Sequence, residues 1–319
     1  MSRPMLVVVG PTCSGKTALA VAAAQALAPA EMLNADSRQV RRGLRVGTCA
    51  PRPSELHGVR CHLLDLCDPG ETFTVADWLA AARRSLERLD RAGTRAVVAG
   101  GTGLYVTALV DGFDLAQVPP DPVRRADRAE LAATPEGLAE LASELRRRDP
   151  VGAPTIDQRN PRRVIRALEI LDAKGGSVLS ARKRAVPRPA VMIGLDVARP
   201  VHARWIEHRI AGMFDSGGIQ DEVRWLLGRG LDRAAIGSCG IGYSEALELI
   251  DGHVDLEAAM QATMRRTLRY ARAQRTWFRR DARLTWFRPD LTAFDQMLAS
   301  VLELVAAASN GRQFAEGGA

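Results

Sequence analysis

The 319-residue sequence has few cysteines and no extended apolar segment. Its five cysteines form no C-x-x-C pair, which argues against a zinc finger. Their odd number, and a beginning that does not resemble a secretory signal, favour reduced thiols in a cytoplasmic protein. Because no run of about eighteen apolar residues occurs, we expect no membrane-spanning helix.

Lysine is also scarce. Only Lys16, Lys174 and Lys183 occur among the 44 Lys and Arg residues, so nearly all positive charge is carried by arginine. A lysine inside a glycine-rich turn is therefore conspicuous. A planar guanidinium does not replace a compact ammonium that lies along two phosphates.

That lysine belongs to the stretch MLVVVGPTCSGKT, residues 5–17. The unbroken apolar run Met5–Val9 predicts a parallel strand buried on both faces, and an alanine-rich helix is expected over 18–27. Between them lies G-x-x-x-x-G-K-[ST], a loop whose backbone N–H groups surround phosphate oxygens. Lys16 would add positive charge, and the Thr17 hydroxyl would hold Mg²⁺. The expected phosphate-binding residues are Gly10, Pro11, Thr12, Cys13, Ser14, Gly15, Lys16 and Thr17.

Alternating strand and helix patterns predict an α/β fold with a P-loop NTPase-like core, a parallel sheet flanked by helices. Further strands are expected at 31–35, 95–99 and 190–196, and helices at 73–92, 200–216, 219–227 and 256–280. Residues 111–188 show helical periodicity broken by prolines, with helices near 122–133, 135–148 and 160–174. We predict a discontinuous core (1–114 and 189–305), an inserted all-helical subdomain (115–188) and a flexible tail (306–319).

Positive charge is concentrated in two segments. Residues 146–188 contain twelve Lys or Arg against four acids, and residues 263–288 contain nine Arg against one acid. Since the whole chain carries only +7, the remainder is acidic. This distribution suggests a polyanionic partner larger than a nucleotide. Solvated helix faces rich in arginine explain either segment alone equally well.

Two strand ends carry candidate chemistry. Asp36 follows the predicted strand 31–35, at the edge where open parallel sheets bind ligands. From the residues alone it could be a metal ligand, a general base or a helix N-cap. The strand 95–99 ends in glycines and Thr102 rather than the Asp of NTP-hydrolysing motors. Such glycines suit a site where something bulky approaches the backbone closely.

Several stretches of the sequence resemble the tRNA dimethylallyltransferase (isopentenyltransferase) family and occur in the family's order. The sequence has no C-terminal zinc finger of the eukaryotic type, so it is most similar to the bacterial members. The stretches are GPTCSGKT at 10–17, NADSRQV at 34–40, GTCAP at 47–51, GGTGLY at 100–105, NPRRVIRALEIL at 160–171, IGYSEA at 241–246 and RYARAQRTWFRRD at 269–281. The loop motif is generic, whereas the last stretch is specific.

The resemblance implies a reaction in which the dimethylallyl group of dimethylallyl diphosphate moves to N6 of the adenosine 3′-adjacent to the anticodon. The expected substrates are tRNAs that read codons beginning with U, recognised at their anticodon stem-loop, with Mg²⁺ as cofactor and a monomeric enzyme. By correspondence, Thr12 and Arg209 would bind the diphosphate and Asp36 would be the general base. The implied tRNA-binding residues are Asp36, Ser37, Arg38, Gln39, Gly100, Thr102, Arg162, Arg163 and Arg166.

One loop departs from the family pattern. Arg45 stands where the family carries Asp, and Ala50 where it carries Lys. We also weighed a dimethylallyltransferase acting on free adenine nucleotides, which would not need two basic segments. A P-loop small-molecule kinase would usually have a carboxylate near Thr102. An RNA-binding module with a purely structural loop would bind tRNA without chemistry.

Overall fold

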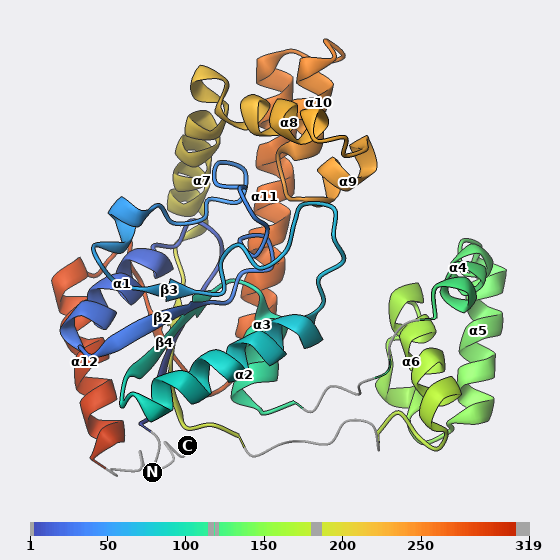
Figure 1. Cartoon of the computed structure of the whole chain (residues 1–319), viewed down its shortest axis with the longest axis horizontal. Helices are drawn as coiled ribbons and strands as arrows, with labels where there is room; N and C mark the ends of the chain where they lie inside the picture. Colours follow the sequence, from blue (N-terminus) through green and yellow to red (C-terminus); the bar gives the residue numbers. More distant parts are fainter. Residues whose placement is uncertain (1–2, 114–117, 119–120, 180–186, 311–319) are drawn as a thin grey trace. The chain divides into compact units, whose positions relative to one another are not determined.

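The computed structural model describes residues 3–113, 118, 121–179 and 187–310 (Figure 1). The chain divides into two compact units, one formed by Met1–Val110 with Arg188–Ala319 and the other by Asp111–Pro187. The second unit corresponds to the insertion predicted at 115–188, but it begins four residues earlier, at Asp111. Parts of both connections lie outside the described residues.

The larger unit contains a sheet of six parallel strands in the order β3-β2-β4-β1-β5-β6. The strands are β1 Met5–Val9, β2 Ala30–Asn34, β3 Cys61–His62, β4 Arg95–Gly100, β5 Ala190–Leu195 and β6 Leu284–Phe287. Every residue of the central β1 is buried, as its apolar run predicts. The predicted parallel α/β fold is thus confirmed, although β3 and β6 were not predicted.

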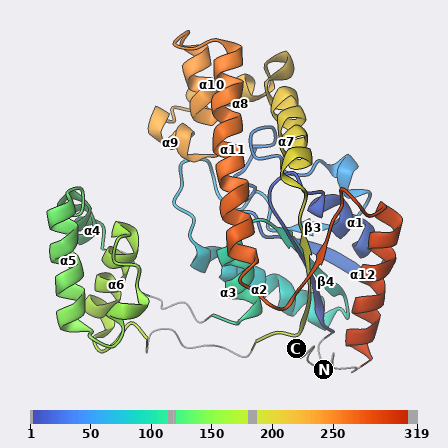
Figure 2. The ribbon, with the colours of Figure 1, turned by 180° about the vertical axis from the view of Figure 1, so that it is seen from behind.

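Helices cover both faces of the sheet (Figures 1 and 2). Helices α1 (Lys16–Ala26) and α12 (Phe294–Ser309) share a core with Leu6 and Val8 of β1. On the other face lie α2 (Val75–Arg91) and α3 (Gly103–Val110), where Trp78 stacks on Tyr105 with ring centroids 4.5 Å apart.

The flexible tail predicted at 306–319 begins too early, because helix α12 extends beyond residue 306. Helix α12 continues to Ser309, whose hydroxyl donates to the Val305 carbonyl at 2.7 Å and accepts from Arg95 at 3.2 Å. Because these bonds hold the last helical turn, a loose segment cannot begin at residue 306 as predicted. Residues 311–319 lie outside the described part of the chain.

Five helices form a second core above the sheet in the view of Figure 1. They are α7 Arg199–Phe214, α8 Gly218–Gly228, α9 Arg233–Ser238, α10 Tyr243–Ile250 and α11 Leu256–Phe278. Short 3₁₀ turns occur at Pro53–Leu56 and Asp215–Gly217. Helices α7, α8 and α11 were predicted, whereas α9 and α10 were not.

The described residues of the smaller unit form α4 (Pro122–Leu131), α5 (Pro135–Arg148), a 3₁₀ turn (Ala153–Thr155) and α6 (Pro161–Lys174). Each of the three α-helices has proline at its first position and an Asp, Thr or Asn cap before it. The unit has its own small apolar core. This agrees with the helices expected from the sequence.

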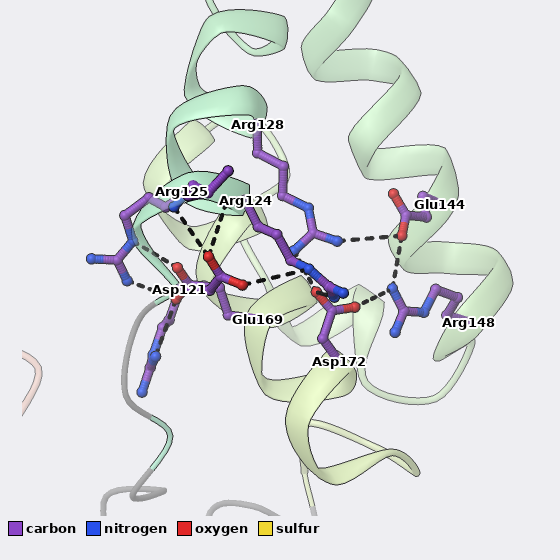
Figure 3. A network of polar contacts seen from close by, with 10 residues as sticks. Asp121, Arg124, Arg125, Arg128, Glu144, Arg148, Glu169 and Asp172 are labelled. Carbon is purple, nitrogen blue, oxygen red and sulfur yellow. Dashed lines mark hydrogen bonds and ion pairs between the residues drawn. The ribbon is translucent and has the colours of Figure 1, made fainter.

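Ion pairs join these three helices (Figure 3). The buried Glu169 accepts two hydrogen bonds from Arg125, at 2.6 and 2.7 Å, and Asp172 accepts from Arg128 and Arg148. Burial alone would raise the pKa of Asp172, but the two arginines lower it to about 2. Part of the arginine-rich composition of this unit therefore stabilises its own fold.

Candidate active site

The phosphate loop connects β1 to the N-terminus of α1, with Lys16 as the first helical residue. Gly15 has φ +83°, which favours glycine, and a Cβ on Gly10 would lie 2.7 Å from the Leu195 carbonyl of β5. The loop N–H groups and the positive end of α1 together create an anion-binding cradle.

Lys16 lies inside this cradle. Its Nζ donates to the Pro11 carbonyl at 3.1 Å. Burial lowers the pKa of Lys16, whereas the nearby negative charge of Asp36 raises it. A bound polyphosphate would stabilise the ammonium further, because opposite charge favours the charged form.

Thr12 is held by three side chains from α7 and α11. Its N–H donates to Gln274 Oε1 at 2.8 Å, and its hydroxyl accepts from Arg209 Nη1 at 3.1 Å. Its carbonyl lies 2.7 Å from His202 Nε2. The structure thus brings together Thr12 and Arg209, which were predicted to share the diphosphate pocket. It adds Gln274 and His202, to which no role was assigned from the sequence.

Asp36 follows β2 in a turn rather than a helix. Its Oδ1 accepts from the Arg38 N–H at 2.9 Å, and its own N–H donates to Asn34 Oδ1 at 3.2 Å. The helix N-cap alternative is therefore wrong: Asp36 closes an Asx-type turn onto Arg38, and a turn over residues 37–40 follows rather than a helix. The carboxylate is fixed at the sheet edge beside the phosphate loop.

At the end of β4 and just after it, three glycines leave no room for a side chain, because other atoms of the protein lie too close. A Cβ on Gly100 would lie 2.2 Å from the Ala35 backbone, one on Gly101 would lie 2.1 Å from Gln274, and one on Gly103 would lie 2.3 Å from Trp277. The atoms that approach these glycines therefore come from the backbone just after β2 and from side chains of α11. Thr102 between them accepts from the Ser37 N–H at 2.9 Å and connects β4 to the Asp36 turn.

The turn after Asp36 is anchored from two directions. Arg38 donates to the Ser238 carbonyl at 2.7 Å, and Gln39 Nε2 donates to the Cys49 carbonyl at 2.9 Å. These contacts use side chains that the family resemblance assigned to tRNA. Ser37, Arg38 and Gln39 thus also support the turn that holds Asp36.

The loop around Arg45, which departs from the family pattern, is held by an ion pair and by hydrogen bonds. Arg45 forms an ion pair with Asp65. The Glu222 carboxylate accepts from the N–H groups of Arg45 and Val46, each at 2.6 Å, and from the Tyr243 hydroxyl at 2.9 Å. Glu222 therefore positions this loop against α8 and α10, a role that gave no signal in the sequence.

These elements enclose a cavity of about 130 Å³. Of the predicted site residues, those that line it are Thr12, Cys13, Ser14, Gly15, Lys16, Thr17, Asp36, Gln39, Gly100 and Arg209. Predicted residues that are not part of its lining are Gly10, Pro11, Ser37, Arg38 and Thr102. The larger unit thus gathers the predicted loop, base and arginine around one space.

The residues present suit a magnesium ion. Hydroxyl and carboxylate oxygens, the ligand type that Mg²⁺ prefers, line the cavity at Ser14, Thr17 and Asp36. Within the described residues, the buried Ser14 Oγ has no hydrogen-bond partner. A hydroxyl of this kind fits a site built for a polar ligand.

The three predicted tRNA-binding arginines of the insertion all lie on α6. Arg162 and Arg163 are exposed at its first turn, and Arg163 lies 3.9 Å from Asp157. Arg166 is half-buried and donates to Glu169 and to the Val118 carbonyl. Arg162 and Arg163 are therefore exposed positive charges on α6, whereas Arg166 supports the fold.

The cradle at the end of the central parallel strand defines the chain as an α/β protein of the P-loop class. Protein-family models described as IPP transferase and Isopentenyl transferase match residues 39–281 and 4–70. The chain belongs to the IPP transferase family.

Individual relatives agree. The chain is 40% identical over 307 residues to a tRNA dimethylallyltransferase of Thermobifida fusca, covering 94% of each chain. A tRNA dimethylallyltransferase of Kineococcus radiotolerans is 39% identical, covering 96% of this chain and 98% of the relative.

Solved structures extend the comparison. The full-length tRNA isopentenylpyrophosphate transferase of Bacillus halodurans is 35% identical, with a TM-score of 0.71, covering 97% of this chain and 98% of that one. A eukaryotic dimethylallyltransferase acting on tRNA is 20% identical with a TM-score of 0.79, a likeness of fold, covering 96% of this chain and 80% of that one. In the described part of the chain, no helix combines the length and apolarity needed to span a bilayer.

Proposed function

We propose that this protein transfers the dimethylallyl group of dimethylallyl diphosphate to N6 of the adenosine 3′-adjacent to the anticodon, in tRNAs that read codons beginning with U. One observation carries the proposal. A single cavity is lined by a phosphate loop, by Arg209 and by the Asp36 carboxylate. The names of the closely similar relatives support the same reaction.

The cradle would bind the leaving group. When the allylic C–O bond breaks, its electron pair passes to the diphosphate oxygen, where negative charge grows. Loop N–H groups, Lys16 and Arg209 stabilise that charge more strongly in the transition state than in the substrate. The loop therefore acts on a departing diphosphate rather than on a phosphoryl group to be transferred.

Asp36 would take the proton from N6. Adenine N6 is a weak nucleophile, so removal of its proton as the carbon–nitrogen bond forms lowers the barrier. The Arg38 N–H holds Oδ1, and we assign Oδ2 to the N6 proton. The products are N6-dimethylallyladenosine and diphosphate.

Of the three thiols in the cavity wall, those of Cys49 and Cys61 would remain unreactive toward the allyl carbon. Burial raises the pKa of Cys49, and it raises the pKa of Cys61 to about 12. The thiolate, rather than the thiol, is the effective nucleophile. Both cysteines therefore remain protonated at neutral pH and do not compete with adenine.

We further propose that the Thr17 hydroxyl holds Mg²⁺ beside the diphosphate. When bound, the ion supplies additional positive charge for the leaving group. On the tRNA side, Ser37, Arg38, Gln39, Gly100 and Thr102 surround Asp36, and the exposed Arg162 and Arg163 suit backbone phosphates. The adenine must leave its stack to enter the cavity.

Label transfer from radioactive dimethylallyl diphosphate tests the proposal, with Mg²⁺ and either tRNA or AMP as acceptor. Label in tRNA is expected, and a matched tRNA with guanosine at the acceptor position should remain unlabelled. Label in AMP would instead identify a free-nucleotide enzyme. ATP turnover without label would indicate a kinase, and tRNA binding without either reaction an RNA-binding module.

We propose a cytoplasmic monomer. The residues assigned to the donor site line one cavity within the larger unit of a single chain. Light scattering of the purified protein, alone and with tRNA, would test this state directly.

A further inference from the structure

His202 lies behind the phosphate loop, outside the cavity lining, and is 1% exposed. Its Nε2 lies 2.7 Å from the Thr12 carbonyl oxygen, and its Nδ1 lies 2.7 Å from Arg275 Nη2. A guanidinium can only donate, so Nδ1 must be the acceptor. The ring proton is therefore on Nε2, which donates to Thr12.

Arg275 is itself held in place. Its Nε donates to Asp196 Oδ1 at 2.7 Å and its Nη2 to the Val197 carbonyl at 2.9 Å. Asp196 follows β5 directly, and its second oxygen accepts from Arg279 at 2.8 Å. A chain of contacts thus runs from the end of β5 through Arg275 and His202 to the loop.

Burial lowers the pKa of His202, and the charges of Arg275 and Lys16 lower it further, whereas the Thr12 carbonyl and Asp196 raise it. The ring is therefore neutral at neutral pH. Both of its nitrogens are committed, one as acceptor and one as donor. A neutral ring of this kind can orient a peptide group without adding charge to the cradle.

The contact acts on one particular peptide group. The Thr12–Cys13 peptide is planar, so a carbonyl directed toward His202 directs the Cys13 N–H to the opposite side. Cys13 lines the cavity, and its φ of +59° is unusual for a residue with a side chain. Such a backbone persists where neighbouring groups hold it.

We infer that His202 is a positioning residue, which fixes the Thr12–Cys13 peptide so that the Cys13 N–H is aimed at the departing diphosphate. The inference rests on the proposed function, since it assigns diphosphate to the loop. His202 touches neither the allyl group nor the adenine. Its loss should therefore weaken the donor side of the reaction and leave tRNA binding unchanged.

Two substitutions test the roles of the two ring nitrogens of His202 separately. In His202→Gln the amide N–H₂ reaches toward the Nε2 position and can still donate to Thr12. In His202→Asn the shorter amide can still accept from Arg275 but cannot reach Thr12. His208→Asn, an exposed change on the same helix, is the matched control.

Calorimetry with inorganic diphosphate, with and without Mg²⁺, measures the predicted effect. We expect His202→Asn to weaken diphosphate binding roughly five- to tenfold, the loss of about one hydrogen bond. His202→Gln should stay within about threefold of the wild type, and tRNA affinity should not change in either variant. Equal losses in both variants, or no loss in His202→Asn, would overturn the inference.

The wild-type protein offers a second test that does not depend on folding of the variants. Nitrogen-15 NMR of labelled histidine should show His202 neutral at pH 7, protonated at Nε2 and unprotonated at Nδ1. The opposite tautomer, or a doubly protonated ring, would refute the inference. Failure of label transfer to tRNA would defeat the proposed function alone, since diphosphate binding and the tautomer are measured separately.

Discussion

The side-chain amide of Gln274 accepts a hydrogen bond from the Thr12 N–H at 2.8 Å, across 262 positions of sequence. Its Nε2 donates to the Gly101 carbonyl at 2.9 Å. One buried amide on α11 therefore joins the phosphate loop after β1 to the glycine loop after β4. The donor cradle and the surroundings of Asp36 are thus held by the same side chain.

Gln274→Glu should weaken this connection while keeping its shape. The carboxylate can accept from Thr12 but cannot donate, and it faces the Gly101 carbonyl. We expect a loss of about 1–3 kcal/mol in the free energy of unfolding, together with a higher KM for dimethylallyl diphosphate. Urea unfolding and initial rates measure the two effects. Gln296→Glu, an exposed change on α12, should alter neither, and equal effects in both variants would contradict this role.

Asp36→Ala should slow label transfer by roughly a hundredfold or more, because no other carboxylate lines the cavity among the described residues. tRNA affinity, measured by filter binding, should change little. Asp65→Ala serves as a control, since Asp65 pairs with Arg45 and does not line the cavity. Near-normal turnover in Asp36→Ala would refute its assignment as base.

The double variant Arg162→Gln/Arg163→Gln should reduce tRNA affinity and its salt dependence. Each lost phosphate contact lowers the slope of log K against log salt by about 0.7–0.9. Arg84→Gln on α2 is an exposed control in the other unit. An unchanged slope in the double variant would remove both arginines from the tRNA interface. Arg166 is left intact because it also bonds Glu169.

We expect the stability of the smaller unit to fall in acid, because of the ion pairs of Asp172. Its pKa is lowered from 3.8 to about 2, so the folded state binds this proton less tightly than the unfolded state. The contribution to stability is therefore complete above about pH 4 and is lost as the pH falls toward 2. In Asp172→Asn, unfolding free energy should decline less steeply over this range, as followed by circular dichroism. Asp127→Asn, exposed on α4, should keep the wild-type slope; an identical slope in both variants would contradict the assignment.

Local patterns predicted much of the core. The run Met5–Val9 and the loop after it identify a buried strand and an anion cradle because their signals lie within about a dozen residues. Proline at helix starts likewise located the three helices of the insertion. The two residues of β3 are too few to show a period, and β6 lies beyond the long α11.

The side-chain contacts that hold the phosphate loop in place could not be predicted in the same way. His202 and Gln274 contact Thr12 across 190 and 262 positions, so only the folded chain brings them together. Gln274 lay in a stretch that resembles the family, which was the one available signal. The glycines after β4 indicated close approach, but not that Gln274 and Trp277 would be the groups that approach.

The central claim is that the loop binds the leaving diphosphate while Asp36 faces the incoming amine. A crystal structure with Mg²⁺, tRNA and a thiolo analogue of dimethylallyl diphosphate tests it most directly. We predict the diphosphate on the N–H groups of residues 13–17 and on Arg209, with the adenine N6 beside Asp36. Diphosphate bound away from the loop, or an N6 out of reach of Asp36, would contradict the account.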